Sequence, residues 1–265
     1  MPHVRSGSAE IYYEIHGSGP TLVLAHGAGG NRVIWFQQVP VFAQRYRVVT
    51  FDHRCFGRST CPPEDFHPKH FTSDLLAILD AEGIERAALV CQSMGGWTGL
   101  PTAVRHPERV ACLALCGTPG GLVTPTVLAA AARIGQNASR DGIRGQAALA
   151  PDFPERRPDL AFLYDQVSGL NVDFPMEALA RMFDPEGRVN PADLADYAIP
   201  TLLVAGEHDG LFPPEVLQEV AKEIPGCAWC DIPGAGHSTY FEDAEQFNAH
   251  VGDFVAQHLD AAARA

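Results

Sequence analysis

Residues 87–96 read AALVCQSMGG, and this stretch is the strongest indication of the fold class. A short apolar run leads into Ser93, and a helical pattern follows it as far as Arg105. The order nearly matches G-x-S-x-G, a strand–turn–helix motif that holds a serine in a tight turn with its hydroxyl exposed. Small residues are needed two positions before and after Ser93, because the two backbones approach closely there. Gly95 meets this need, and Cys91, small but tighter than glycine, takes the earlier position.

Short apolar runs like the one before Ser93 recur along the chain and alternate with helical patterns. Runs that are apolar on both faces are typical of a parallel sheet covered by helices on both sides. We therefore predict an α/β fold with a mostly parallel central sheet flanked by helices. Pro101 should kink its helix, because proline lacks the backbone donor. The predicted strands are residues 9–15, 21–25, 46–51, 87–91, 110–116, 200–205 and 226–232, and the predicted helices are residues 70–81, 94–105, 127–134, 158–166, 213–223 and 243–259.

The regular alternation is lost after Cys116 and returns near Pro200. The intervening sequence is rich in Ala, Arg, Gly and Pro, and it offers helical stretches but no convincing strand. A helical stretch that interrupts an α/β core indicates an insertion that covers one end of the sheet. We predict a core domain of residues 1–118 and 194–265, with a helical cap of residues 119–193.

Two further loops offer partners for the serine. Ligands of open α/β sheets bind beyond the carboxyl ends of the strands, so the loops there carry the chemistry. His237 ends the glycine-rich loop PGAGH and can serve as the base that a serine nucleophile needs. Asp209, in the loop GEHDG, can orient that histidine, and Glu207 is its nearest rival. The chain order Ser93, Asp209, His237 is the one expected for this fold. We predict these three as catalytic residues.

An acyl-transfer site also needs donors for the oxyanion. We predict that the backbone N–H groups of Met94 and Ala28 supply them, with Gly29 as the fallback for Ala28. Ala28 lies in the glycine-rich loop HGAGG, which follows the second predicted strand. This loop has neither the G-x-G-x-x-G spacing nor the Gly-Lys-Ser/Thr ending of a phosphate-binding loop.

The composition of the chain limits the classes of molecule that it is expected to bind. The 19 Lys and Arg residues against 32 Asp and Glu residues give a net charge of −13, which argues against nucleic acid or an anionic membrane. We expect no transmembrane helix and no signal peptide, because neither pattern is visible. Seven cysteines without such a signal predict reduced thiols and a cytoplasmic protein. Cys227 and Cys230 should point to opposite faces of a strand and serve as core thiols. We predict no cofactor and no metal.

The motifs together resemble the α/β-hydrolase family, over about residues 11–258 except the predicted cap. The resemblance is closest to the esterase, lactonase and C–C hydrolase branches. One family motif often reads D-x-R-G-x-G-x-S, and here Cys55 replaces its first glycine, with Asp52 and Arg54 expected in structural hydrogen bonds. The motifs that carry the resemblance are HG at residues 26–27, DHRCFGRS at residues 52–59, and the loops that contain Ser93, Asp209 and His237.

We predict a serine hydrolase that cleaves a small, largely apolar carboxylic ester or lactone through an acyl-enzyme on Ser93. The alternatives are a C–C hydrolase of a ring-cleavage product and a small-molecule receptor on the same scaffold. A cap arginine that faces the pocket would favour the C–C reaction, whose substrates carry carboxylates. Whether the chain forms a homodimer is left open. The candidate arginines are Arg133, Arg140, Arg144 and Arg181, and the candidate pocket residues are Trp35, Phe162, Tyr164, Phe212 and Tyr240.

Overall fold

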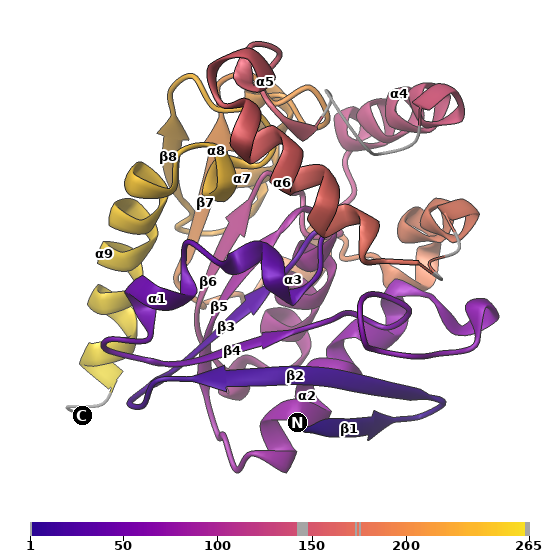
Figure 1. The fold of residues 1–265 in the computed structure, drawn as a ribbon. Helices are drawn as coiled ribbons and strands as arrows, with labels where there is room; N and C mark the ends of the chain where they lie inside the picture. The colour runs from indigo at the N-terminus through magenta and orange to yellow at the C-terminus, as the bar shows by residue number, and fades with distance from the viewer. Residues whose placement is uncertain (1, 142–147, 173, 175, 263–265) are drawn as a thin grey trace.

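The computed structural model describes residues 2–141, 148–172, 174 and 176–262. Within these residues the strands form one sheet in the order β1-β2-β4-β3-β5-β6-β7-β8 (Figure 1). Strands β3 to β8 run parallel to one another, whereas at one edge β1 pairs antiparallel with β2, and β2 pairs antiparallel with β4. The predicted α/β fold with a mostly parallel sheet is confirmed. The strands are β1 (His3–Ser6), β2 (Ala9–His16), β3 (Thr21–Ala25), β4 (Arg47–Phe51), β5 (Ala87–Gln92), β6 (Val110–Cys116), β7 (Thr201–Gly206) and β8 (Ala228–Ile232).

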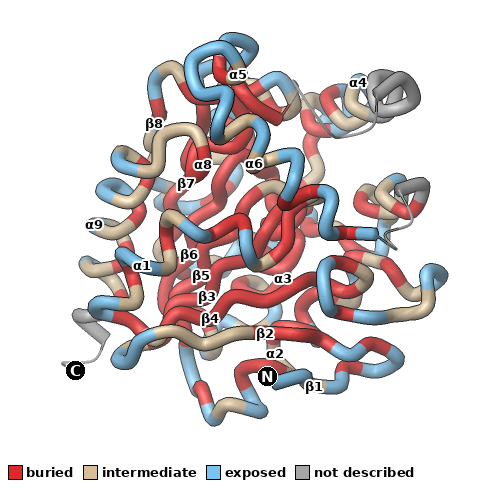
Figure 2. Tube along the Cα trace, viewed as in Figure 1, coloured by how far each residue is buried: buried red, intermediate tan, exposed pale blue. Residues whose placement is uncertain are grey.

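Helices cover both faces of the sheet, and each face has its own apolar core (Figure 2). Leu75, Leu100 and Leu217 represent the helices of one face, and Phe247 represents the other. Burial of each such side chain stabilises the fold by roughly 1.5–3 kcal/mol. Strands β3, β5, β6 and β7 are buried along their whole length, which explains their continuous apolar sequences. The helices of the core are α1 (Val39–Phe42), α2 (Phe71–Ala81), α3 (Gly96–Arg105), α7 (Pro214–Glu223), α8 (Thr239–Glu242) and α9 (Ala244–Ala262).

The described residues between β6 and β7 are helical or irregular. Figure 1 places α4, α5 and α6 on the side of the sheet toward which the parallel strands point. We call residues 119–193 the cap segment, and its boundaries as a domain remain a prediction. Its helices are α4 (Pro125–Asp141), α5 (Phe153–Arg156) and α6 (Pro158–Gly169), followed by short 3₁₀ helices at Met176–Phe183, Pro185–Gly187 and Pro191–Leu194.

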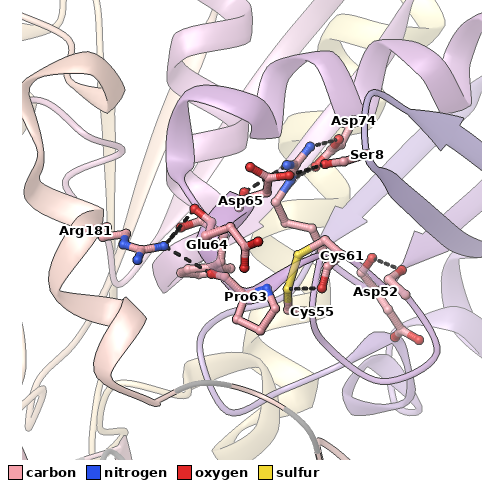
Figure 3. The surroundings of a disulfide bond; sticks show 12 residues. Ser8, Asp52, Cys55, Cys61, Pro63, Glu64, Asp65, Asp74 and Arg181 are labelled. Atoms are coloured by element: carbon pink, nitrogen blue, oxygen red, sulfur yellow. Dashed lines mark hydrogen bonds and ion pairs between the residues drawn. A yellow bond between two sulfur atoms is a disulfide. The ribbon is translucent and has the colours of Figure 1, made fainter.

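The cysteines depart from the prediction of reduced thiols. Cys55 and Cys61 form a disulfide in the loop after β4, with their Cα atoms 5.3 Å apart (Figure 3). The prediction rested on the cysteine count and not on spacing, and a separation of six residues lets a loop fold back within disulfide reach. The remaining five cysteines are free. Cys227 and Cys230 pack against opposite core clusters, as predicted, but both are partly exposed at the edge of the sheet and not core thiols.

None of the helices in the described ranges combines the length and the apolar character that a bilayer crossing needs.

Candidate active site

Ser93 lies in a sharp turn between β5 and α3. Its backbone has φ +49°, in the left-handed region that residues other than glycine rarely adopt. The turn fits because its neighbours are small: a Cβ on Gly95 would lie 2.3 Å from the Ala25 carbonyl oxygen. Pro101 lies inside α3, and a 3₁₀ turn, Ser93–Gly95, precedes that helix, so the helix begins two residues later than predicted. The strand–turn–helix context that the sequence predicted around Ser93 is present.

Cys91 stands where the motif prefers glycine, and the structure accommodates it through Gly99 on the facing turn of α3. The thiol is buried, and burial raises the pKa of Cys91 far above its ordinary value. It therefore stays protonated and packs as a small apolar group. Ser93 is only partly buried, so it is the serine and not the thiol that is accessible in this turn.

Asp209 and His237 meet across the loops after β7 and β8. The imidazole Nδ1 lies 2.9 Å from the Asp209 Oδ2, and both side chains are buried. The other carboxylate oxygen accepts hydrogen bonds from the amides of Leu211 and Phe212, at 2.8 and 2.9 Å. An ionised carboxylate can only accept, so Nδ1 carries the proton and Nε2 is left as the basic nitrogen. Within the described part of the chain, that Nε2 has no hydrogen-bond partner.

Glu207, the rival to Asp209, lies elsewhere. It is exposed, and its carboxylate accepts a hydrogen bond from the amide of Gly234 at 2.9 Å. The loop that carries His237 also lies close to the end of β7, because a Cβ on Gly206 would come within 1.9 Å of the Gly236 carbonyl oxygen. Glycine at both positions allows this approach, which brings His237 to the carboxylate of Asp209.

The loop after β3 packs directly against the serine. A Cβ on Gly27 would lie 2.8 Å from the Ser93 Cβ and 2.0 Å from the Gln92 Oε1. His26 holds the loop through both ring nitrogens. Its Nδ1 lies 2.8 Å from the Gly27 carbonyl oxygen, and its Nε2 accepts a hydrogen bond from the His53 amide at 3.0 Å. Burial lowers the pKa of His26 to about 4, so the ring is neutral and can both donate and accept.

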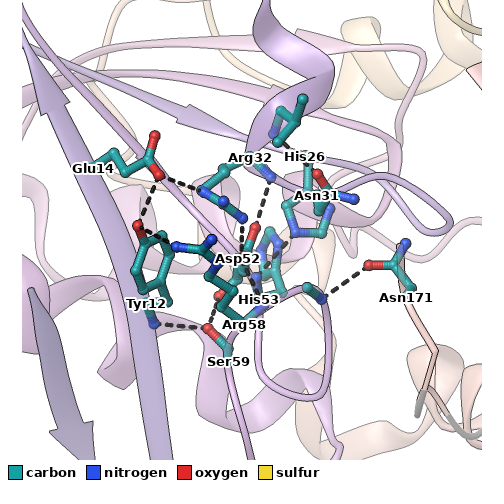
Figure 4. A network of polar contacts seen from close by, with 12 residues as sticks. Tyr12, Glu14, His26, Asn31, Arg32, Asp52, His53, Arg58, Ser59 and Asn171 are labelled. Carbon is teal, nitrogen blue, oxygen red and sulfur yellow. Dashed lines mark hydrogen bonds and ion pairs between the residues drawn. The ribbon is translucent and has the colours of Figure 1, made fainter. Parts of the chain in front are cut away.

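Asn171, a residue of the cap segment, also binds the loop after β3. Asn171 donates to the carbonyl oxygens of Gly29 and Gly30, at 3.0 and 3.1 Å, and accepts the amide of Gly57 at 2.9 Å. Figure 4 shows its carboxamide reaching the loop after β4. Gly29 adopts φ +81°, a conformation suited to glycine. No motif in the sequence points to Asn171, because its partners in these two loops lie more than a hundred residues away.

The motif at residues 52–59 forms structural contacts. Asp52 accepts the Arg32 and Arg58 amides at 2.8 Å and the Arg32 guanidinium at 2.9 Å (Figure 4). Arg54 forms a buried ion pair with Asp74 at 2.6 Å. These contacts fix the loop that carries Cys55, whose φ of +65° lies in the left-handed region that favours glycine. The expected structural hydrogen bonds of Asp52 and Arg54 are confirmed.

The five predicted pocket residues occupy different places. Phe212 is buried with its ring centre 6.2 Å from that of His237, and the Tyr164 hydroxyl lies 3.0 Å from the Ser238 Oγ, next to the same histidine. Trp35 and Tyr240 are buried against each other in the core, with ring centres 4.6 Å apart. Phe162 is 66% exposed. Only Phe212 and Tyr164 therefore enter the pocket proposed below.

Two of the four candidate cap arginines can be placed. Arg181 donates to the carbonyl oxygens of Pro63, Glu64 and Phe66, beside the disulfide (Figure 3). Arg133 is exposed on α4. The side chain of Arg140 and the whole of Arg144 lie outside the described residues. Among the residues that are described, no group of three or more His, Cys, Asp or Glu side chains could hold a metal ion.

Comparison with known proteins adds independent findings. A family model described as alpha/beta hydrolase fold matches residues 20–244. The chain is 28% identical to the protein named as carbamate hydrolase RutD of Azorhizobium caulinodans, covering 97% of this chain and 99% of the relative. It is 33% identical to 2-hydroxymuconate semialdehyde hydrolase of a Pseudomonas species, covering 97% and 94%. A solved structure, Est816, described as an N-acyl homoserine lactone degrading enzyme, is 27% identical with a TM-score of 0.80, covering 96% and 100%.

Proposed function

The chain belongs to the alpha/beta hydrolase fold family, and we propose that it hydrolyses a small, largely apolar carboxylic ester or lactone through an acyl-enzyme on Ser93. The observation that carries the proposal is the hydrogen bond between the His237 Nδ1 and the Asp209 carboxylate, which leaves the Nε2 as a base with no partner among the residues described. The two sequence relatives are named as hydrolases and the solved structure is described as a lactone-degrading enzyme, which supports the reaction class.

In the first half of the reaction, the Ser93 Oγ attacks the carbonyl carbon while the His237 Nε2 accepts its proton. The resulting imidazolium then gives that proton to the departing alkoxide, and the C–O bond of the ester breaks. Asp209 holds the imidazole in the required tautomer and stabilises its positive charge. The acyl group remains on Ser93.

In the second half, His237 removes a proton from water, and the resulting nucleophile attacks the acyl carbon. The proton returns to the Ser93 Oγ as the acid leaves. The backbone N–H groups of Ala28 and Met94 stabilise the negative oxygen in both halves, at roughly 3–4 kcal/mol for each donor. The contact of Gly27 with Ser93 supports a role for this loop, since it brings the Ala28 peptide next to the nucleophile.

The substrate class follows from charge and lining. A net charge of −13 disfavours polyanionic substrates. Phe212 offers apolar surface near His237, and Tyr164 belongs to the cap segment that would close the pocket over it. The likeness to a lactone-degrading enzyme supports lactones as well as open esters, and the likeness to the RutD protein adds carbamates to the substrates worth testing.

A second candidate is hydrolysis of a C–C bond in a ring-cleavage product, which the 33% identical Pseudomonas relative favours. Such substrates carry carboxylates that an arginine could bind. Arg181 is engaged with backbone carbonyl groups and Arg133 is exposed. These two candidate arginines therefore give the C–C reaction no support, and we rank it second.

The test is turnover of a panel by the wild type and by Ser93→Ala. The panel holds p-nitrophenyl acetate, butyrate and octanoate, simple lactones, an N-acyl homoserine lactone, a carbamate and a dienoate C–C substrate. Ester or lactone turnover that falls at least about a thousandfold in Ser93→Ala, with an unchanged circular dichroism spectrum, is the expected result. Turnover of the dienoate alone would put the second candidate first. Equal turnover by the two proteins would overturn the proposed nucleophile.

A further inference from the structure

Glu242 binds the backbone on both sides of His237. It ends α8, five residues after the histidine, and its Oε1 accepts the amides of Gly236 at 3.1 Å and Ser238 at 3.3 Å. Its Oε2 accepts the amide of Ala150, in the cap segment, at 2.8 Å. One carboxylate therefore joins three backbone donors from two parts of the chain.

The contacts fix the loop closely. A Cβ on Gly236 would lie 2.3 Å from the Ala150 nitrogen, so the loop of His237 and the cap segment are in direct backbone contact at this point. Hydrogen bonds to an ionised acceptor are the strong ones, and two of the three hold peptide groups on either side of His237. The carboxylate thereby limits how far the His237 ring can move from Ser93 and Asp209.

We propose that Glu242 is a positioning residue for His237, which holds the catalytic loop through its backbone and supplies a second negative charge that stabilises the imidazolium. The inference deepens the proposed function and rests on it, because only a catalytic His237 needs to become positively charged. In each half of the reaction the proton moves onto the imidazole, and the carboxylates of Asp209 and Glu242 would then both attract the same cation.

Few other charged groups among the described residues lie near Glu242 and His237. Tyr164, Tyr240 and Cys116 lie in the same buried environment, and burial raises the pKa of each, to about 12 for Tyr164. These groups therefore stay neutral across the pH range of an ordinary assay. Two exposed groups contact the loop at Gly234: Glu207 accepts its amide and Arg156 donates to its carbonyl oxygen.

The electrostatic link is reciprocal. Burial raises the pKa of Glu242 above its ordinary value, and the three backbone hydrogen bonds and, to a smaller extent, attraction to His237 oppose that rise. A charge that His237 stabilises must stabilise a charged His237 to the same extent. Removal of the Glu242 charge therefore makes protonation of His237 less favourable.

The test is the pH profile of kcat/KM for Glu242→Gln, with a p-nitrophenyl ester that the wild type hydrolyses. The substitution keeps the shape but removes the charge, and an amide cannot accept three backbone hydrogen bonds equally well. We expect the acid limb to move to lower pH by about half a unit to one unit. We expect kcat on the plateau to fall roughly tenfold, with KM changed less than about twofold, since the interaction acts on the transition state.

Glu207→Gln is the matched control. Glu207 also binds the loop by one amide, but it is exposed, so solvent screens its charge. Its profile should match that of the wild type. Glu242→Asp keeps the charge on a shorter side chain, so we expect a lower kcat with an unshifted acid limb.

An acid limb of Glu242→Gln that coincides with the wild type would overturn the inference. If that variant does not fold, Glu242→Asp decides, because wild-type kcat in that variant contradicts the positioning role. An NMR titration of the His237 imidazole separates this inference from the proposed function. The midpoint should fall in Glu242→Gln whether or not Ser93→Ala retains turnover, and an unchanged midpoint contradicts the charge coupling.

Discussion

The thiol of Cys91 fills the space that a side chain on Gly99 would need: a Cβ on Gly99 would lie only 2.6 Å from the Cys91 Sγ. Cys91 is on β5, two residues before Ser93, and Gly99 is on α3, six residues after it. The departure from glycine on the strand is thus matched by a glycine on the helix. The turn at Ser93 keeps its shape because the two positions together hold one small side chain.

This relationship predicts that Gly99→Ala destabilises the protein. The added methyl group would also come within 2.7 Å of the Leu113 Cδ1, so the core must shift, at a cost of about 1–3 kcal/mol. Urea unfolding measures the cost. In Cys91→Gly the same Gly99→Ala change should cost less, because part of the obstruction is gone. Additive effects in the double variant would contradict the coupling.

The buried histidines predict a loss of stability in mild acid. The His26 pKa is lowered from 6.5 to about 4, so between these values the unfolded chain binds a proton that the folded chain does not. Stability from this group is fully present above pH 6.5 and falls as the pH drops, by about 2 kcal/mol at pH 5. Urea unfolding at pH 7 and pH 5 measures the fall. His26→Gln should be less stable at pH 7 but lose about 2 kcal/mol less between the two pH values. An equal loss in both proteins would argue against a buried neutral His26.

The disulfide predicts a contrast between two double variants. Removal of the disulfide that closes the seven-residue loop from Cys55 to Cys61 should lower the free energy of unfolding by about 2 kcal/mol. Because Cys55 has φ +65°, Cys55→Gly/Cys61→Ala should be more stable than Cys55→Ala/Cys61→Ala by about 1 kcal/mol. Urea unfolding without reductant compares the three proteins. The reverse order of the two variants would show that residue 55 is not left-handed in solution.

Asn171 predicts a link between the cap segment and the oxyanion donors. Asn171→Ala removes the hydrogen bonds to the Gly29 and Gly30 carbonyl groups, so the neighbouring Ala28 amide should be held less firmly. We expect kcat to fall roughly tenfold with a small change in KM, and binding of a boronic acid inhibitor to weaken in parallel. Asn190→Ala, at an exposed capping position of the same segment, is the control and should leave kcat unchanged. A wild-type kcat in Asn171→Ala would remove this residue from the proposed mechanism.

Most of the fold could be predicted because its signals are local. Seven strands lie within two residues of their predicted ends, since each is a short apolar run between turns. The missed strand, β1, has four residues and pairs only at the edge of the sheet, so burial leaves little trace in its sequence. The antiparallel direction of β2 was likewise not visible, because pairing direction depends on the partner strand.

The contacts that organise the candidate site were harder to predict. The pairing of Asp209 with His237 was predictable, since both follow strands of one sheet and their loops meet at one edge. Asn171 contacts Gly29, and Glu242 contacts Ala150, so each contact joins segments far apart in the chain. Neither Asn171 nor Glu242 belongs to a motif. The disulfide is local, but Cys55 and Cys61 were counted with the other thiols and not considered as a pair.

The strands that bracket the cap segment are neighbours. The chain leaves the sheet at Cys116, the end of β6, and returns at the start of β7, where Thr201 pairs with Leu113 of the same strand β6. The two ends of the excursion are therefore held together by the sheet itself, whatever lies between them. Lengthening such a loop costs little, because loop-closure entropy grows slowly with length. The whole stretch could therefore be replaced by the corresponding stretch of another hydrolase without a change in strand register. Such an exchange is a route to new substrates.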